Sequence, residues 1–350
     1  MKKKSLSAKK KIHNKLLTSL KNPLINKFYK KFDSFIKFNL NKSTFSVAVS
    51  GGSDSLALAF LAKCYSIQKN KKYLYFIVDH KLRKESTKEA KLTKKNLKTY
   101  GINCEILIWN KKKLVSNLQS AARENRYKLI FNKCSEKKIN LILTAHHKDD
   151  LYENFFIRLL RGSGLKGLSS FSSLKTKINK EKDIFVFRPL LNISKNDLAY
   201  IAKKTFNFFI IDPSNEDDKF LRIKIRKLIN QLTQNGLDFK KFKLTLENLY
   251  KSNQTIEFYV KKNIKDNSIF LNQKKSIILS ENFLNQPDEI IFRSFSELIH
   301  KLGNKKKYTR GSKILNLIRS INLSENFKKK TLSGCTFEKL NKSIIISQER

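Results

Sequence analysis

Residues 50–55 read Ser50-Gly51-Gly52-Ser53-Asp54-Ser55 and lie between an apolar run, 45–49, and a segment of helical period. A strand, a glycine turn and a helix in this order direct backbone N–H groups and the positive end of a helix dipole to one point, where an anion can bind. The loop lacks the Lys of a Gly-x-x-x-x-Gly-Lys-Ser/Thr phosphate loop, and an acid, Asp54, stands at the start of the helix. We predict a phosphate-binding loop; the alternative is that Ser53 and Asp54 only cap the helix.

The acid in this loop requires a cation, because a carboxylate repels phosphate groups. Mg²⁺ between Asp54 and the phosphates would remove that repulsion and would stabilise the charge on a departing pyrophosphate. We therefore expect Asp54 to be a magnesium ligand.

Short apolar runs alternate with longer segments of helical period around and after the loop. Repeated strand–helix units indicate a doubly wound parallel α/β sheet of the Rossmann-like kind, which binds ligands at the carboxyl ends of its strands. Two later runs, 184–187 and 208–211, are candidates for additional edge strands. The expected strands are 45–49, 73–78, 104–109 and 141–144, and the expected helices are 53–68, 86–100, 116–137 and 149–160.

The domain organisation follows from changes in composition. A polar turn cluster, 212–218, predicts the end of the α/β domain, which we assign to residues 1–215 together with a basic N-terminal helix. Residues 216–304 are Lys-rich and of helical period, which predicts a helical domain. Residues 305–350 contain an alternating apolar run near their end and predict a small C-terminal domain with some β structure.

The charge of the chain suggests a polyanionic partner. Its 350 residues carry a formal net charge of +45, which attracts nucleic acids. An AT-rich genome would also encode a Lys-rich surface, so charge alone does not identify the partner. The positions of Arg are more informative, because Arg forms bidentate phosphate contacts and Lys is the usual base in this chain. Eight of the twelve Arg residues lie between positions 83 and 226.

Several classes of protein are disfavoured. No apolar run approaches the roughly 20 residues that span a bilayer, and the polar residues that follow Met1 predict no secretion signal. The four Cys residues form no Cys-x-x-Cys pair, which argues against a zinc ribbon, an iron–sulfur site or a disulfide framework. We expect a cytoplasmic protein.

Polar residues also stand at the ends of other expected elements. Asp79 and His80 end the second strand, where they would lie beside a nucleotide or would only cap the strand. Arg123 and Arg126 are one helical turn apart in the helix 116–137, so both can face one anion. Solvated helix charges are the alternative for this pair.

Residues 144–153 read Thr-Ala-His-His-Lys-Asp-Asp-Leu-Tyr-Glu and run from a strand end into a helix. Asp150 and Glu153 share one face of that helix, where they suit an ammonium group. A zinc site is the alternative, but His146 and His147 have no Cys or third His to complete it. The helix ends in Arg161-Gly162-Ser163-Gly164, a basic loop predicted to contact phosphate or RNA, with a flexible helix cap as the alternative.

The loop resembles the signature of the PP-loop ATP pyrophosphatase superfamily, Ser-Gly-Gly-x-Asp-Ser. The complete set of motifs resembles the tRNA(Ile)-lysidine synthase family, because the family motifs occur in order over about residues 45–226. One position departs from the family pattern, since Ile223 follows Arg222 where the family usually has Asn. The matching motifs are Ser-Gly-Gly-x-Asp-Ser, Val-Asp-His-x-Leu-Arg, Ala-Arg-x-x-Arg-Tyr, Thr-Ala-His-His-x-Asp-Asp-x-x-Glu, Arg-Gly-Ser-Gly-Leu, Arg-Pro-Leu and Asp-Pro-Ser-Asn.

The resemblance implies a ligase that forms a C–N bond and uses ATP and Mg²⁺. Its substrates would be free lysine and the wobble cytidine in the CAU anticodon of tRNA(Ile), and its product, lysidine, would change codon reading from AUG to AUA. The C2 carbonyl of the cytosine would be adenylated, and the ε-amine of lysine would then displace AMP.

The resemblance also implies roles for the candidate residues. The loop 50–55, Asp79 and His80 would bind ATP, and the domain 216–304 would bind tRNA, as its charge also suggests. The oligomeric state stays open, with a homodimer as one possibility. The expected catalytic residues are Asp54, His146, Asp150 and Glu153. The expected contacts with phosphate or tRNA are Arg123, Arg126, Arg161, Gly162, Ser163, Gly164, Arg222 and Arg226.

Two other functions fit part of the sequence. A PP-loop tRNA thiolase, or another tRNA-modifying enzyme that adenylates a base, would share the loop. A thiolase needs catalytic Cys pairs or a Cys-bound cluster, and the sequence has neither near the loop. A non-catalytic RNA-binding protein with a relic loop predicts the loss of Asp54, which is present.

Overall fold

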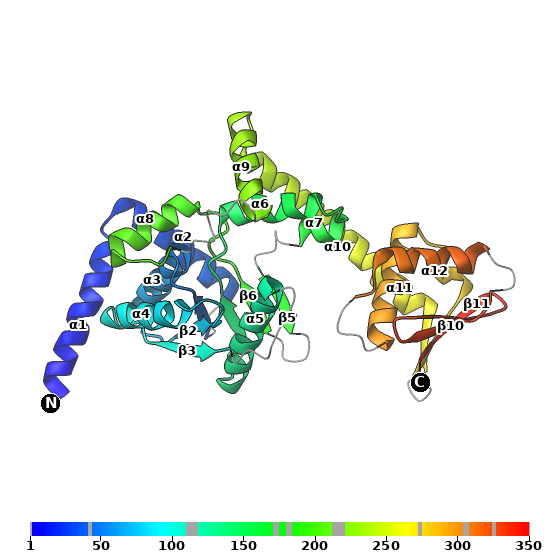
Figure 1. Ribbon diagram of the computed structural model, residues 1–350, viewed down its shortest axis with the longest axis horizontal. Coiled ribbons are helices and arrows are strands. Elements are labelled where there is room, and N and C mark those ends of the chain that lie inside the picture. Colours follow the sequence, from blue (N-terminus) through cyan, green and yellow to red (C-terminus); the bar gives the residue numbers. More distant parts are fainter. Residues whose placement is uncertain are drawn as a thin grey trace. The chain divides into compact units, whose positions relative to one another are not determined.

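A six-stranded sheet forms the centre of the N-terminal part of the chain in the computed structural model (Figure 1). Its strand order is β3-β2-β1-β4-β6-β5, and every neighbouring pair is parallel except β5 and β6. The order reverses between β1 and β4, which places the segments after these two strands at one topological switch point. The strands are β1 (Ser46–Val49), β2 (Leu74–Asp79), β3 (Cys104–Ile108), β4 (Leu141–Leu143), β5 (Lys175–Asn179) and β6 (Ile184–Phe187).

The chain divides into two units, residues 1–242 and 243–350, and the division falls inside the long helix α10 (Phe239–Asn267). Among the residues that the structure describes, no helix has both the length and the apolar character of a membrane span. The structure describes residues 2–40, 44–109, 118–170, 175–179, 184–211, 221–271, 275–303, 308–323 and 327–349, without the side chains of 2–10, 118–123 and 175–179.

Helices cover both faces of the six-stranded sheet because successive strand residues point to opposite sides. Tyr75 and Ile77 of β2 belong to one buried cluster with residues of α2, α3 and α8, whereas Phe76 between them belongs to another with residues of α5. The predicted doubly wound α/β fold is therefore confirmed. The helices of this unit are α1 (Lys2–Ser19), α2 (Pro23–Leu40), α3 (Ser53–Gln68), α4 (Ser86–Thr99), α5 (Leu118–Glu136), α6 (Lys148–Leu159), α7 (Leu165–Ser169), α8 (Lys195–Phe206) and α9 (Leu221–Gln234).

Helix α3 is the central helix of this arrangement. Every residue from Ser55 to Ala62 is buried, so the helix is apolar on all sides rather than along one stripe. It packs against β1, α2 and α8, and it begins at Ser53, directly after the glycine loop. The position of the loop is therefore fixed by the core of the unit.

The predicted strand at 208–211 is wrong. Residues 208–211 are irregular, and the N–H of Ile210 donates to the carbonyl of Gly51 over 2.9 Å. The free edge of β6 is occupied by β5 instead, which forms an antiparallel pair with it. The apolar run at 208–211 therefore packs against the glycine loop instead of joining the sheet.

The second unit contains a five-stranded antiparallel sheet of order β7-β8-β11-β10-β9. Its core includes Ile277, Phe295 and Phe337, which come from a strand, a helix and another strand of the unit. Besides the rest of α10, its elements are β7 (Ser268–Leu271), β8 (Ser276–Leu279), the short 3-10 helix η3 (Glu281–Phe283), α11 (Asp288–Leu302), α12 (Gly311–Leu323), β9 (Lys330–Leu332), β10 (Cys335–Leu340) and β11 (Ser343–Gln348).

This arrangement differs from the three predicted domains, 1–215, 216–304 and 305–350. Helix α9 packs against α6 and so belongs with the α/β unit. Strands β7 and β8 interrupt the segment expected to be wholly helical, and β8 pairs with β11 from the expected C-terminal domain. Because one sheet spans both segments, residues 243–350 form a single unit. The polar cluster 212–218 lies outside the described residues.

Candidate active site

The glycine loop holds its backbone in a conformation that requires glycine. Gly51 has φ +91°, and a Cβ at this position would lie 2.6 Å from Thr93 Oγ1 and 3.0 Å from Ile210 Cγ1. The loop is therefore packed between α4 and the segment 208–211. This close packing explains why a side chain is excluded at Gly51, as well as why the turn needs positive φ.

The side chain of Ser55 organises the start of the loop. Its Oγ accepts hydrogen bonds from the N–H of Ser50 and the N–H of Gly51, at 3.1 and 3.2 Å, and donates to the carbonyl of Gly52 at 2.9 Å. The first turn of α3 has no such side-chain cap, since its N-cap residue is Gly52. The N–H groups at that end of α3 are thus oriented for an anion, as the phosphate-loop prediction requires.

Asp54 stands in the first turn of α3, and the segment after β4 faces it. Asp54 Oδ2 lies 3.6 Å from Nε2 of His147, whose side chain is only 5% exposed. His147 Nε2 also lies 3.5 Å from Asp150 Oδ2, and its Nδ1 lies 3.5 Å from Asp149 Oδ2. The switch point therefore brings the loop and the acidic segment into one site around a buried imidazole.

The pKa values within this group reflect burial and mutual attraction. Burial raises the pKa of Asp54, despite the opposing effect of His147 and Lys195. Burial also opposes ionisation of Asp150, but His147, His146 and Arg222 outweigh it and lower the pKa of Asp150. For His147, burial is outweighed by Asp149, Asp150 and Asp54, so its pKa is raised.

His147 was not among the predicted catalytic residues, whereas His146 was. His146 lies beside the same site, with its Nδ1 2.8 Å from Thr144 Oγ1, and its charge helps to lower the pKa of Asp150. The imidazole that contacts Asp54 and Asp150, however, is that of His147. Two adjacent His residues point in different directions, and the sequence carries no signal that separates them.

Two arginines of α9 cover the acidic face of α6. Arg222 donates to Glu153 through Nε and to Asp150 through a terminal nitrogen, and Arg226 Nε lies 2.6 Å from Glu153 Oε1. The Glu153 side chain is only 2% exposed, while those of Arg222 and Arg226 are 41% and 30% exposed. Asp150 and Glu153 were predicted to bind an ammonium group, and Arg222 and Arg226 were predicted to bind phosphate or tRNA. In the structure these acids and arginines form ion pairs with each other.

Ile223 occupies the position where the family usually has Asn. Its side chain is buried in α9. At this position a buried apolar side chain therefore replaces the polar side chain that the family usually has. The contacts of Arg222 and Arg226 with Glu153 are still formed.

Asp79 has its carboxylate engaged by the start of α4. Its Oδ1 accepts from the N–H of Lys81 and from Ser86 Oγ, both at 3.0 Å, and its Oδ2 accepts from Thr87 Oγ1 at 2.6 Å. These bonds outweigh the effect of burial and lower the pKa of Asp79. The geometry therefore favours the strand-end cap that we considered as the alternative to an ATP contact.

His80 and Arg126 form a second contact at the carboxyl end of the sheet. Arg126 Nε donates to His80 Nε2 over 3.1 Å, and the His80 ring meets Trp109 edge to face. Burial and the charge of Arg126 lower the pKa of His80 to about 4, so the imidazole is neutral at pH 7. Arg126 is thereby held beside the predicted nucleotide crevice. The side chain of Arg123, one turn earlier in α5, lies outside the described residues.

The basic loop 161–164 forms the turn between α6 and α7. Gly162 has φ +66°, and the N–H groups of Gly162 and Ser163 donate to carbonyls of the last turn of α6. Gly164 is the N-cap of α7, and Arg161 is exposed. These bonds describe a helix cap, and the exposed Arg161 stays a predicted RNA contact.

Asp54 is suited to hold a cation together with phosphates. Among the described residues, no group of three His, Cys, Asp or Glu side chains is arranged to hold a metal by itself. A Mg²⁺ ion commonly binds one or two carboxylates and completes its shell with phosphates and water. The partly exposed carboxylate of Asp54, in the first turn of α3, fits that arrangement.

The four Cys residues are all free thiols in buried positions. Burial raises the pKa of Cys104 to about 12 and that of Cys134 to about 11. A thiol with so high a pKa is a poor nucleophile and a poor metal ligand at pH 7.

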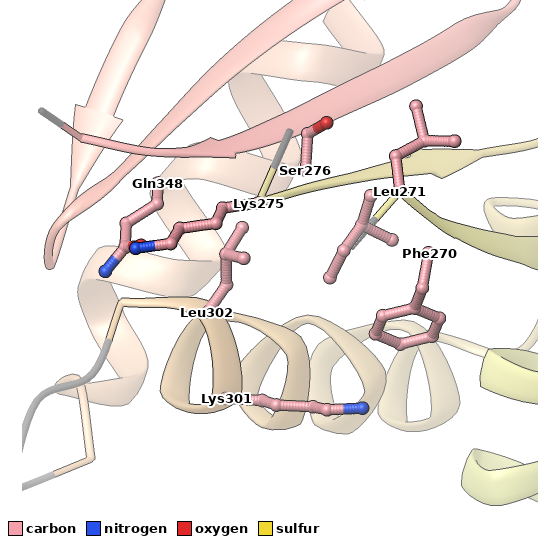
Figure 2. Close-up of a pocket in the computed structure, with 8 residues that line it drawn as sticks. Phe270, Leu271, Lys275, Ser276, Lys301, Leu302 and Gln348 are labelled. Atoms are coloured by element: carbon pink, nitrogen blue, oxygen red, sulfur yellow. The ribbon is translucent and has the colours of Figure 1, made fainter. Parts of the chain in front are cut away.

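A hollow of about 320 Å³ lies in the second unit. Figure 2 shows Phe270 and Leu271 of β7 on one side and Lys301 and Leu302 of α11 on the other. The Lys301 ammonium lies 4.0 Å from the centre of the Phe270 ring. This hollow contains no residue of the glycine loop or of the acidic segment, so it is separate from the candidate active site.

A reversed strand order, a glycine loop after β1 and carboxylates after β4 define an ATP-binding protein of the PP-loop class. The PP-loop domain model matches residues 24–233, which include all of this site. The chain belongs to the tRNA(Ile)-lysidine synthase family, as its similarity to curated members of that family shows.

Three relatives named tRNA(Ile)-lysidine synthase illustrate the match. Those of Orientia tsutsugamushi, Anaplasma marginale and Wolbachia pipientis are 34%, 30% and 33% identical to this chain, over 87%, 84% and 87% of its length. The aligned regions cover 69%, 63% and 70% of those relatives. A solved U34-tRNA thiolase of Methanococcus maripaludis has a TM-score of 0.55 at 19% identity, covers 65% of this chain and 79% of its own, and shows the shared fold alone.

Proposed function

We propose that this chain ligates free lysine to C2 of the wobble cytidine in the CAU anticodon of tRNA(Ile). The C2 carbonyl oxygen attacks the α-phosphorus of ATP and releases pyrophosphate. The ε-amine then attacks C2, a C–N bond forms, the C2–O bond breaks, and AMP leaves with the oxygen. The amine proton passes to a base in the site. Family membership supports this reaction, and so do the two halves of the site.

The observation that carries the proposal is the contact of the two halves. Asp54 of the glycine loop and Asp150 of the acidic face lie 3.6 and 3.5 Å from the same imidazole nitrogen. In our proposal the loop binds the ATP phosphates, with Mg²⁺ held by Asp54, and the acidic face binds the lysine whose ε-amine displaces AMP. Bound Mg²⁺ would supply charge stabilisation of the departing pyrophosphate.

The pairs between α6 and α9 suit an amino acid zwitterion. Asp150 and Glu153 can receive the α-ammonium group of lysine, and Arg222 or Arg226 can receive its carboxylate. Such binding would exchange part of the present ion pairs for pairs with the ligand, so no charge would be left buried alone. The free ε-amine would then point to the cytosine, with His146 or one carboxylate accepting its proton.

A thiolase of the same superfamily remains the second candidate, and the thiols argue against it. Cys104 and Cys134 are buried, and their raised pKa values leave little thiolate at pH 7.

The proposed substrates, tRNA, ATP and free lysine, occur together in the cytoplasm, where we expect the protein to act.

The Asp54→Asn variant tests the activation step. The substitution keeps the size of the side chain but removes the charge that holds Mg²⁺, so we expect AMP formation to be abolished. Filter binding of tRNA(Ile) should be nearly unchanged, because the overall positive charge remains. A strong loss of tRNA binding would instead make Asp54 a structural residue and would contradict its proposed role.

A further inference from the structure

We propose that His147 is a positioning residue that links the nucleotide loop to the acidic face and thereby aligns the two half-reactions. This inference rests on the proposed function. His147 has no chemical role in either half-reaction, but it contacts Asp54 of the glycine loop and Asp150 of the acidic face.

The His147 ring is held in place from several directions. His147 forms an isolated parallel β-bridge with Leu190 and is the N-cap residue of α6. Its backbone N–H donates to Asp150 Oδ2 over 3.0 Å. The next residue, Lys148, donates its N–H to the carbonyl of Ile193. With the backbone tied to the neighbouring segment 190–193 and the side chain 5% exposed, the ring is kept away from solvent.

The two ring nitrogens have different surroundings. Nδ1 faces Asp149 at 3.5 Å, and Asp149 itself accepts from the N–H of Lys195 over 2.8 Å. Nδ1 has no hydrogen-bond partner among the described residues, so its contact with Asp149 is electrostatic. Nε2 faces the site, 3.6 Å from Asp54 Oδ2 and 3.5 Å from Asp150 Oδ2.

These nearly equal distances indicate a bridge rather than a single hydrogen bond. Both exceed the usual range for an N–H···O bond, and one N–H group can donate to only one carboxylate at a time. A small shift of either Asp54 or Asp150 would bring one carboxylate within hydrogen-bonding distance of Nε2 and leave the other beyond it. The ring also separates two like charges, which would otherwise repel each other across the site.

The position of Asp150 should therefore depend on that of Asp54. When ATP fixes Asp54, His147 has a fixed neighbour on one side, and Asp150 is held in the geometry that receives lysine. The two substrates would then bind to one aligned unit, although they contact different elements of the fold.

Two amide variants separate the two ring nitrogens. The amide nitrogen of His147→Gln reaches about as far as Nε2, whereas that of His147→Asn reaches only about as far as Nδ1. If the contacts of Nε2 are required, the His147→Gln variant should keep kcat/KM values close to those of the wild type. Asn should lower kcat/KM for both ATP and lysine by about 10- to 100-fold, the usual effect of losing a residue that orients a ligand group.

The assay measures pyrophosphate release at varied ATP and lysine transfer at varied lysine, each with tRNA(Ile) saturating, together with the melting temperature of each variant. Parallel losses in both parameters for Asn, rescue by Gln and similar melting temperatures support the link. Loss in only one parameter, or Asn outperforming Gln, would overturn it. Failure of the wild type to transfer lysine would instead refute the proposed function, and the link with it.

Discussion

At the scale of single residues, Gly51 sets the shape of the glycine loop. Its φ of +91° and the 2.6 Å that would separate an added Cβ from Thr93 Oγ1 both exclude a side chain. We expect Gly51→Ala to abolish AMP formation. Backbone strain alone costs about 1–3 kcal/mol, and because the added Cβ also collides, the free energy of unfolding should fall by more than that. Urea unfolding and an AMP assay measure the two effects.

Gly236→Ala is the matched control for that substitution. Gly236 has φ +94°, nearly that of Gly51, but a Cβ there meets no atom within 4 Å. It therefore carries the backbone strain without the collision. Equal effects of the two substitutions would show that packing against Thr93 and Ile210 has no part in forming the loop.

The His80 imidazole predicts a dependence of stability on pH. Its pKa is about 4 in the folded protein, below the value near 6.5 of a free His, so the unfolded chain binds more protons between these pH values. The free energy of unfolding should therefore fall as pH drops from 6.5 to 4. Allowing for partial solvent screening, His80 contributes on the order of 1–2 kcal/mol of this fall. Urea unfolding across this range should show a shallower decline for His80→Gln, and an identical decline would contradict the assignment.

At the scale of elements, the pairing of α6 with α9 depends on Glu153. Its buried carboxylate accepts from both Arg222 and Arg226, so Glu153→Gln removes the negative charge that faces the two guanidinium groups, while Arg222 keeps its bond to Asp150. Because both arginines are partly exposed, we expect a loss of about 1–3 kcal/mol in urea unfolding rather than that of a fully buried pair. The KM for lysine should also rise.

Glu247→Gln provides the comparison. Glu247 pairs with Lys243 within α10, and the two side chains are 49% and 40% exposed. Such a pair contributes less than about 1 kcal/mol. A similar cost for both substitutions would mean that the α6–α9 ion cluster does not stabilise the α/β unit.

The sequence predicts elements best where local signals agree with the core. Helix α3 has the predicted bounds, Ser53 to Gln68, because the glycine turn and the apolar residues after it point to the same structure. The run 208–211 has strand-like residues, but its place is decided by Gly51, far away in the sequence. Strand β5 is polar and has no apolar alternation, so only its pairing with β6 reveals it.

The candidate site also combines features set by local sequence with features set by contacts between distant residues. The loop and the acidic segment are each visible as local motifs, and the parallel fold predicts that they meet at strand ends. The contact of Arg222 with Glu153 joins residues 69 positions apart, and no local pattern indicates it. Nor does the pattern show which of His146 and His147 faces Asp54.

At the scale of the whole molecule, the two units have separate cores. Gly303 lies in the second unit, where a Cβ would collide with the carbonyl oxygen of Ser333 and would stand 2.9 Å from that of Ile299. We expect Gly303→Ala to lower the melting temperature of residues 243–350 and to leave the α/β unit folded. Hydrogen exchange, followed separately for the amides of each unit, measures both effects.

Gly311→Ala is a milder change in the same unit, since its Cβ would lie 3.4 Å from the Phe292 ring, an ordinary contact. Loss of protection in α3 or β1 on Gly303→Ala would show that the two units unfold together and would contradict the division at residue 242.

Transfer of labelled lysine shows directly whether the chain joins lysine to tRNA(Ile). The protein is incubated with ATP, Mg²⁺, labelled lysine and unmodified tRNA(Ile) with a CAU anticodon, and with the same tRNA carrying uridine at the wobble position. We predict ATP-dependent label in the first tRNA, release of AMP in equal amount, and no label in the second. Absence of label under conditions where the first tRNA binds would show that the chain does not catalyse this ligation.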